Sequence, residues 1–138
     1  MSKVLPASCE EAFDLWLDEE QFHLWMRPSD ADLIDVEWRP LVGNTFRFDL
    51  RESDGRIFTH TGHFLEIQRP RLIKMTWNST VLGGHTSQVS VEFTKQDGRC
   101  AVVLIHDLPD DEAIFRDHQR GWMVIWQRFV DTIDSQEK

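Results

Sequence analysis

The longest element of the chain, and the one that decides its fold, is predicted by the stretch HDLPDDEAIFRDHQRGWMVIWQRFVDTI, residues 106–133. At about 100° per residue, one broad face of this stretch collects the apolar side chains Ile114, Phe115, Trp122, Ile125, Trp126, Phe129 and Ile133. Pro109 is followed by Asp110, Asp111 and Glu112, which provide an N-cap candidate and first-turn acids. We therefore expect a long amphipathic helix that needs a second layer to cover its apolar face.

One position on that face is unusual, because His118 lies near the middle of the apolar arc, where leucine or phenylalanine is the ordinary residue. Two interpretations are open: a core histidine with satisfied hydrogen bonds, or part of a site. Gly121, three residues later, costs about 1 kcal/mol relative to alanine in a helix interior. A glycine at this position indicates that the sheet backbone or a bound molecule comes close to the helix. Packing alone is the simpler interpretation.

The amino-acid composition restricts the class of protein to which the chain can belong. The 138 residues suit one domain, and the formal charge of −9 comes from scattered single bases among 24 acids. Nucleic acid and anionic membranes are therefore poor candidate partners, and no stretch approaches the 18 apolar residues of a membrane span. Cys9 and Cys100 lack paired spacing, which favours reduced thiols in a cytoplasmic protein over a disulfide framework or a structural zinc site.

Two short helices are expected near the amino terminus. Ser8 and Glu11 form a capping box for a helix over residues 9–17. Asp18 is expected to cap a second helix that buries Phe22, Trp25 and Met26 and stops before Pro28.

The middle of the chain changes to a period of two. Alternation over residues 45–51 and 57–67, around an Asp54-Gly55 turn, predicts a β-hairpin. Further strands are expected at 71–77, 87–93 and 100–107, with an Asp97-Gly98 turn between the last two, and an imperfect one near 33–38. The expected fold is α+β, with a curved antiparallel sheet wrapped around the long carboxy-terminal helix and two short helices near the amino terminus.

The hairpin register decides what the inner face contains. With Asp54 and Gly55 as a two-residue loop, Leu50 faces Thr59, Phe48 faces Thr61 and Phe46 faces His63. Polar residues from separate elements then come together with His106 and His118. Either they form hydrogen bonds with one another in a solid core, or they line a cavity. We expect a cavity lined by Phe48, Thr61, His63, Met75, Trp77, Val91, Leu104, His106, Phe115, His118 and Trp122.

Motifs for catalysis or metal binding are not found in the sequence. His60 and His63 are three apart on a strand and point to opposite faces, and no His-Glu-x-x-His or Cys-x-x-Cys spacing occurs, so no metal or cofactor is expected. General acid or base chemistry by His106 or His118 stays open. The segment STVLGGH, residues 79–85, is interpreted either as a lid over the cavity or as a packed loop.

Several segments together resemble a known family. They are PASCEEAFDLWLDEEQFHLWMRP, VGNTFRFDLRESDGR, HTGHFLEIQRPRLIKMTW, QVSVEF and VVLIHDLPDDEAIFRDHQRGW, which span nearly the whole chain. In this order and spacing they resemble the START/SRPBCC superfamily with its helix-grip fold, in the branch similar to activators of the heat-shock chaperone ATPase. The resemblance implies a sheet gripping the carboxy-terminal helix, with a cavity that takes hydrophobic molecules in related proteins.

Three departures from that family pattern are visible. The family's first strand is reduced to Lys3, Val4 and Leu5, which would leave part of residues 100–107 as an open edge, so a homodimer is one hypothesis. The family commonly has two consecutive tryptophans after the second helix, and this chain has Trp25-Met26 in their place. The separate amino-terminal domain of the eukaryotic activators has no counterpart in these 138 residues, so chaperone activation is not carried over.

The leading hypothesis is a small cytoplasmic binding protein for a hydrophobic or amphipathic molecule, without a catalytic motif. A chaperone-associated interaction module is the alternative. A cyclase or hydrolase that uses a cavity histidine is a third hypothesis.

Overall fold

The structure is a computed structural model that describes residues 1–80 and 86–136. Its strands form an antiparallel sheet in the order β1-β7-β6-β5-β4-β3-β2. The strands are β1 (Ser2–Leu5), β2 (Asp32–Glu37), β3 (Thr45–Arg51), β4 (Ile57–Gln68), β5 (Leu72–Ser79), β6 (Ser87–Gln96) and β7 (Arg99–Asp107), and the helices are α1 (Cys9–Leu17), α2 (Phe22–Trp25) and α3 (Glu112–Gln136). This is the helix-grip arrangement predicted from the sequence.

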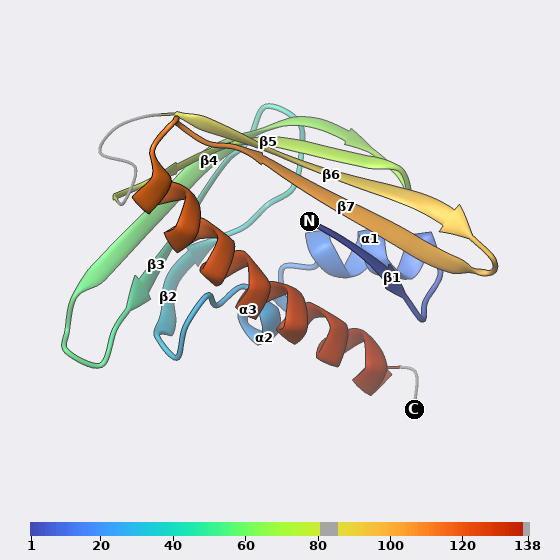
Figure 1. The fold of residues 1–138 in the computed structure, drawn as a ribbon, viewed down its shortest axis with the longest axis horizontal. Helices are drawn as coiled ribbons and strands as arrows, with labels where there is room; N and C mark the ends of the chain where they lie inside the picture. The colour runs from blue at the N-terminus through green and yellow to red at the C-terminus, as the bar shows by residue number, and fades with distance from the viewer. Residues whose placement is uncertain (81–85, 137–138) are drawn as a thin grey trace.

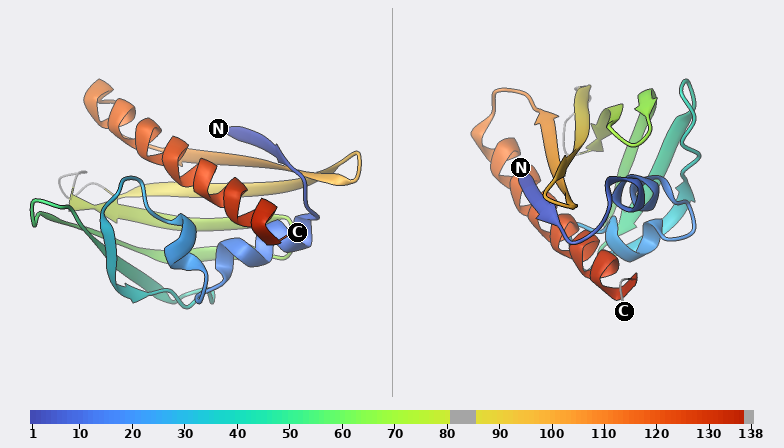
Figure 2. Two further views of the ribbon diagram at one scale, coloured as in Figure 1. Left: turned by 90° about the horizontal axis from the view of Figure 1, so that it is seen from below. Right: turned by 90° about the vertical axis from the view of Figure 1, so that its right-hand side faces the viewer.

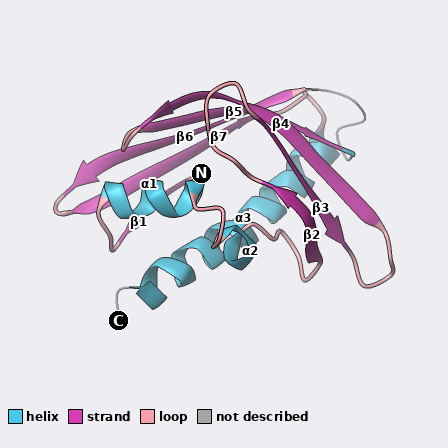
Figure 3. Cartoon of the chain, turned by 180° about the vertical axis from the view of Figure 1, so that it is seen from behind, coloured by secondary structure: helices cyan, strands magenta, loops and turns pink. Residues whose placement is uncertain are grey.

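The long helix α3 runs obliquely across the concave side of the curved sheet (Figure 1). Figures 2 and 3 show α1 and α2 on the same side, so the three helices and the sheet enclose one core. The three acids that follow Pro109 were predicted to start α3, and the structure shows that Asp111 caps the helix. Its carboxylate accepts hydrogen bonds from the backbone N–H groups of Ala113 and Ile114 at 3.0 and 3.1 Å.

The core is filled by aromatic rings from both layers. Trp16, Trp25, Trp38, Phe46, Phe48, Phe64 and Phe129 are all fully buried. Trp25 packs edge-on against Phe129 of α3 with ring centroids 5.0 Å apart, and Trp38 packs in the same way against Phe46 at 5.1 Å. Trp16 of α1 also packs against Phe129, with ring centroids 5.4 Å apart, so Phe129 fixes the carboxy-terminal half of α3 against α1 and α2.

The two short helices differ in how well they were predicted. Helix α1 has the bounds expected from the capping box, and its Glu11 N–H donates to Ser8 Oγ at 3.1 Å. Helix α2 is only Phe22–Trp25, which is shorter than predicted. Asp18 accepts from the N–H of Glu20 in the turn before α2 and does not cap the helix itself.

The register predicted for the β3–β4 hairpin is wrong by one residue. Phe48 pairs with His60 and Leu50 with Phe58, because the connection is a five-residue loop in which the N–H of Glu52 donates to the carbonyl of Arg56. A shift of one residue turns every side chain of β4 to the other face at this end of the strand. Thr61 and His63, predicted inside, therefore lie on the outer face, and His60 lies on the inner face.

A register irregularity in β4 restores the predicted orientation further along. The pairing with β5 shifts between Phe64 and Glu66, so Ile67 again faces the core beside its partner Ile73 while Leu65 is exposed. Before the shift, Gly62 lies under the ring of Phe46. A Cβ at this position would overlap the backbone oxygen of Thr76 and approach Phe46 Cζ to 2.5 Å.

The edge expected to be open is largely covered. Strand β1 pairs with β7 from Ser2 opposite Val103 to Leu5 opposite Cys100. Ile105, beyond the end of β1, stays 50% exposed. The reason for expecting a homodimer therefore holds only at Ile105, and the homodimer stays a prediction. Of the segment predicted as a lid or loop, residues 81–85 lie outside the described residues.

The two cysteines meet in the core although they are 91 residues apart. Cys9 at the start of α1 and Cys100 at the start of β7 are both free thiols and buried, with their Sγ atoms 2.6 Å apart. Burial raises the pKa of the Cys100 thiol to about 12, and the contact with Cys9 contributes in the same direction.

Candidate functional site

Three histidines from three elements gather beneath the amino-terminal half of α3. They are His60 of β4, His106 of β7 and His118 of α3. The rings of His106 and His118 lie edge to face, with centroids 5.3 Å apart. His60 and His118 line the same cavity. Their roles are distinguished by the hydrogen bonds that each ring already makes.

His106 is held by a continuous hydrogen-bond chain. Trp122 Nε1 donates to His106 Nδ1 at 2.9 Å, which assigns the ring proton of the neutral form to Nε2. That nitrogen donates to Ser87 Oγ at 2.7 Å, and Ser87 donates to the carbonyl of Trp77 at 2.6 Å. Burial lowers the pKa of His106 to about 3, and charge on His118 and His60 would lower it further. His106 is therefore a neutral residue with both nitrogens engaged.

His60 is the opposite case, a buried ring with an unused nitrogen. It stacks on Phe48 with centroids 4.7 Å apart and planes within 2°. Its Nδ1 is buried and has no hydrogen-bond partner among the described residues. Such an atom costs about 1–3 kcal/mol when it stays unsatisfied. Burial is also the main reason that the pKa of His60 is lowered to about 4, so the ring is neutral at pH 7.

His118 uses one nitrogen within its own helix. Its Nδ1 donates to the carbonyl of Ile114, one turn earlier, at 2.9 Å. Because a carbonyl only accepts, Nδ1 carries the proton and the neutral ring presents Nε2 as an acceptor. No partner for Nε2 is found in the part of the chain that the structure describes, and the side chain is half-buried.

The cavity shared by His60 and His118, here called the hairpin-side cavity, has a volume of about 430 Å³. It lies between α3, the β3–β4 hairpin and the segment after α2. Its lining comprises Pro28, Ser29, Leu50, Glu52, Arg56, Phe58, His60, Asp117, His118, Arg120 and Gly121. The two acids and two arginines among them cancel in formal charge. Gly121 is close to Pro28, because a Cβ there would lie 3.1 Å from Pro28 Cβ.

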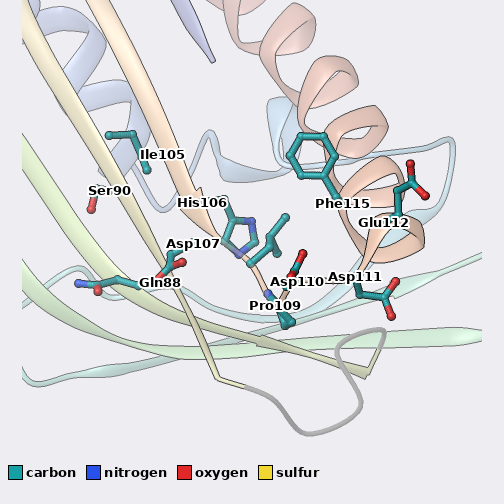
Figure 4. A pocket seen from close by; sticks show the side chains of 11 residues that line it. Gln88, Ser90, Ile105, His106, Asp107, Pro109, Asp110, Asp111, Glu112 and Phe115 are labelled. Atoms are coloured by element: carbon teal, nitrogen blue, oxygen red, sulfur yellow. The ribbon is translucent and has the colours of Figure 1, made fainter.

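The other flank of α3 has a smaller apolar groove, here called the strand-side groove, of about 290 Å³. It is lined by Met1, Leu104, Ile105, His106, Leu108, Phe115, Gln119 and Trp122. It adjoins a wider hollow of about 1020 Å³, whose lining is drawn in Figure 4 and includes Gln88, Asp107, Asp110, Asp111 and Glu112. Two of these acids are already engaged: Asp111 caps α3, and Glu112 pairs with Arg116 at 3.3 Å.

The predicted lining residues are therefore divided among four places. Phe48, Met75, Trp77 and Val91 are buried in the packed core. Leu104, His106, Phe115 and Trp122 line the strand-side groove, and Phe115 is 53% exposed there. His118 lines the hairpin-side cavity, whereas Thr61 and His63 lie on the outer face of the sheet.

The most informative cavity residue, His60, was missed because of the register error. The sequence did contain a signal: the predicted outer face placed Phe58, His60 and Phe64 beside Arg47 and Asp49, which is an unusual mixture for a solvated face. The described residues contain no group of three His, Cys, Asp or Glu side chains arranged to hold a metal ion. None of their helices is both long enough and apolar enough to span a membrane.

The sequence profile of one family matches this chain over residues 6–134. Its description is "Activator of Hsp90 ATPase homolog 1-like protein". The chain belongs to this family. The match covers all three helices up to residue 134 and all strands except β1, so the family assignment includes both sides of the hairpin-side cavity.

Solved structures share the fold of this family member at low identity. A protein from Silicibacter pomeroyi is similar with a TM-score of 0.85 and 14% identity, over 99% of this chain and 96% of that one. Another, from Rhodobacter sphaeroides, has a TM-score of 0.84 and 12% identity over 98% and 91%. A third, from Chromobacterium violaceum, has a TM-score of 0.83 and 16% identity over 96% and 94%. No curated protein matches the chain.

Proposed function

We propose that this family member binds a hydrophobic or amphipathic small molecule beneath the amino-terminal half of α3, with the hairpin-side cavity as the principal site. The observation that carries the proposal is the hairpin-side cavity itself, which has a volume of about 430 Å³ and is lined by apolar side chains together with His60 and His118. Nε2 of His118 has no partner among the described residues, so a ligand in the cavity finds a polar group of the protein to bind.

The packing of α3 supports the same location. In its carboxy-terminal half, Ile125, Trp126, Phe129 and Ile133 are buried against the core. Its amino-terminal half has a cavity on one flank and a groove on the other. The cavity volume falls within the roughly 300–1,000 Å³ that is usual for small-molecule sites, and its lining combines apolar side chains with a few polar groups.

Native mass spectrometry of the freshly purified protein, followed by denaturation and identification of released molecules, tests the proposal directly. A stoichiometric small molecule is expected. His118→Trp should fill the cavity and abolish its retention, whereas His63→Trp, on the outer face, should retain it. Equal retention by the two variants would place the ligand elsewhere. If the protein is free of ligand and binds none of the probes 2-naphthol, naphthalene and 2-naphthoate in isothermal titration calorimetry, the proposal fails.

A protein-interaction role is the second candidate function, and the family description is the observation that favours it. It predicts that the purified protein raises the ATP hydrolysis rate of Hsp90 and that His118→Trp leaves this effect unchanged. This candidate is removed if a saturating amount of the protein does not change the ATP hydrolysis rate of Hsp90.

A further inference from the structure

The two cysteines of the chain are brought together by elements that are far apart in the sequence. Cys9 is the first residue of α1 and Cys100 is the second residue of β7, and their Sγ atoms lie 2.6 Å apart. Both are free thiols. An approach of about 0.5 Å brings two sulfurs from this separation to the S–S bond length. Neither residue lines the hairpin-side cavity or the strand-side groove, so the pair is separate from the proposed ligand site.

The backbone around each thiol is fixed by hydrogen bonds. Cys100 lies within β7, which is paired with β1 on one side, where Leu5 is its partner, and with β6 on the other. Cys9 follows Leu5 closely in the sequence, and its helix is fixed at its start by Ser8, whose Oγ accepts from the N–H of Glu11 at 3.1 Å. The fold therefore holds the two sulfurs against each other before any bond forms.

A metal site is another use of a close pair of thiols, but the surroundings do not favour one here. Within residues 1–80 and 86–136, no third His, Cys, Asp or Glu side chain joins the two cysteines in a group that could hold a metal ion. Cys9 Sγ donates to Cys100 Sγ, and Cys100 Sγ has a long contact of 3.9 Å with the carbonyl of Ala101. The pair is thus suited to a bond between its own sulfurs.

We propose that Cys9 and Cys100 are a modification site, at which a low-molecular-weight disulfide such as oxidised glutathione converts the two thiols into an intramolecular disulfide. One protein thiol gives up its proton and attacks a sulfur of oxidised glutathione, which forms a mixed disulfide and releases one glutathione thiolate. The second protein thiol gives up its proton, attacks the protein sulfur of the mixed disulfide and releases the second glutathione. The protein loses two electrons and two protons, and oxidised glutathione becomes two thiols.

The position of the pair makes the reaction slow and its product stable. Cys9 and Cys100 are 3% and 0% exposed, so the first attack requires local opening of β1 and the start of α1. Strand β1 is at the edge of the sheet and its first three residues are exposed, which is typical of segments that open readily. The new bond closes a loop between residues 91 positions apart, and burial shields it from reducing agents.

Overnight incubation of the folded protein in mixtures of reduced and oxidised glutathione tests the inference. After alkylation of the remaining thiols in denaturant, intact mass spectrometry is expected to show a monomer that has lost two hydrogen atoms and carries no glutathione. The urea midpoint of this oxidised protein should be higher than that of the reduced protein by about 1–3 M. Low concentrations of urea, below the unfolding transition, should accelerate the oxidation.

The variants Cys9→Ala and Cys100→Ala each leave one thiol, so the glutathione mixture should not raise the urea midpoint of either. A thiol pair that stays reduced in the most oxidising mixture overturns the inference. It is equally overturned by a persistent mixed disulfide, by a disulfide between two chains, or by an oxidised monomer whose midpoint is not raised. If a variant does not fold, the comparison of oxidised and reduced unmodified protein is decisive on its own.

Discussion

Trp122 Nε1 donates a hydrogen bond to His106 Nδ1 at 2.9 Å, and this bond joins α3 to the sheet at the place where the helix leaves the packed core. The chain continues through Ser87 Oγ to the carbonyl of Trp77. Every member is satisfied, so His106 acts as a structural connection between α3, β7 and the β5–β6 strands.

Replacing His106 should therefore destabilise the fold. In His106→Leu the indole N–H of Trp122 loses its acceptor, and we expect the free energy of unfolding to fall by about 1–3 kcal/mol. Urea denaturation followed by far-UV circular dichroism measures this change. Trp122→Phe and the double variant complete a cycle, in which a clearly non-zero coupling energy is expected. Strictly additive effects would contradict the hydrogen bond.

The histidine cluster should make stability depend on pH. The folded-state pKa values of His106 and His60 are lowered to about 3 and about 4, below the ordinary 6.5. Below pH 6.5 the unfolded chain thus binds protons that the folded chain does not, so stability falls as the pH decreases from 6.5 toward 4 and 3, and is fully present above 6.5.

Between pH 7 and 5 we expect a loss of about 1–2 kcal/mol for each of these two histidines, measured by urea denaturation. This range avoids most of the carboxylate titration. The variant His60→Phe should lose less stability over the same interval than the unmodified protein, and His63→Phe should behave like the unmodified protein. A flat profile from pH 7 to 5 would show that the histidines are solvated in the folded state.

Gly62 should tolerate no side chain. The Cβ of Gly62→Ala would overlap a backbone oxygen of β5 and the ring of Phe46, so we expect a loss of about 2 kcal/mol or more in the free energy of unfolding. Gly121→Ala is the matched control: its Cβ meets only Pro28, at 3.1 Å, and alanine gains about 1 kcal/mol in helix propensity. A neutral Gly62→Ala would contradict the observed packing of Phe46.

The two thiols should be unreactive in the folded protein. Cys9 and Cys100 are 3% and 0% exposed, and the pKa of Cys100 is raised to about 12, so little thiolate is available at pH 8. We expect Ellman's reagent to modify neither thiol until denaturant unfolds the chain, and then to modify both. Rapid modification of native protein at a rate independent of denaturant would contradict this burial.

Local signals were sufficient for most elements of the fold. The N-cap of α1 at Ser8, the acidic start of α3 and the Asp97-Gly98 turn each act over a few residues, and the structure shows all three. Asp97 and Gly98 both have positive φ, as the tight turn between β6 and β7 requires. Inward residues of β5, β6 and β7 also followed from simple alternation.

The candidate site depended on information that is not local. The Asp54-Gly55 pair predicted the turn but not its length, and the five-residue loop exchanged His63 for His60 on the inner face. The bonding of His106 to Trp122 and Ser87 joins three elements, and a sequence gives no sign of which buried histidine will be satisfied. A cavity, moreover, is what side chains fail to fill, so it depends on packing throughout the domain.

The position of Trp122 also gives the protein an optical reporter. Its indole lies 5.3 Å from Trp77 and 6.4 Å from Trp16, and it forms one wall of the strand-side groove. Excitation absorbed by the buried indoles is passed readily between rings at such separations, so the emission of the whole set is sensitive to a change beside one of them. Occupation of the hollows under α3 should accordingly be visible as a change in intrinsic fluorescence, without a label.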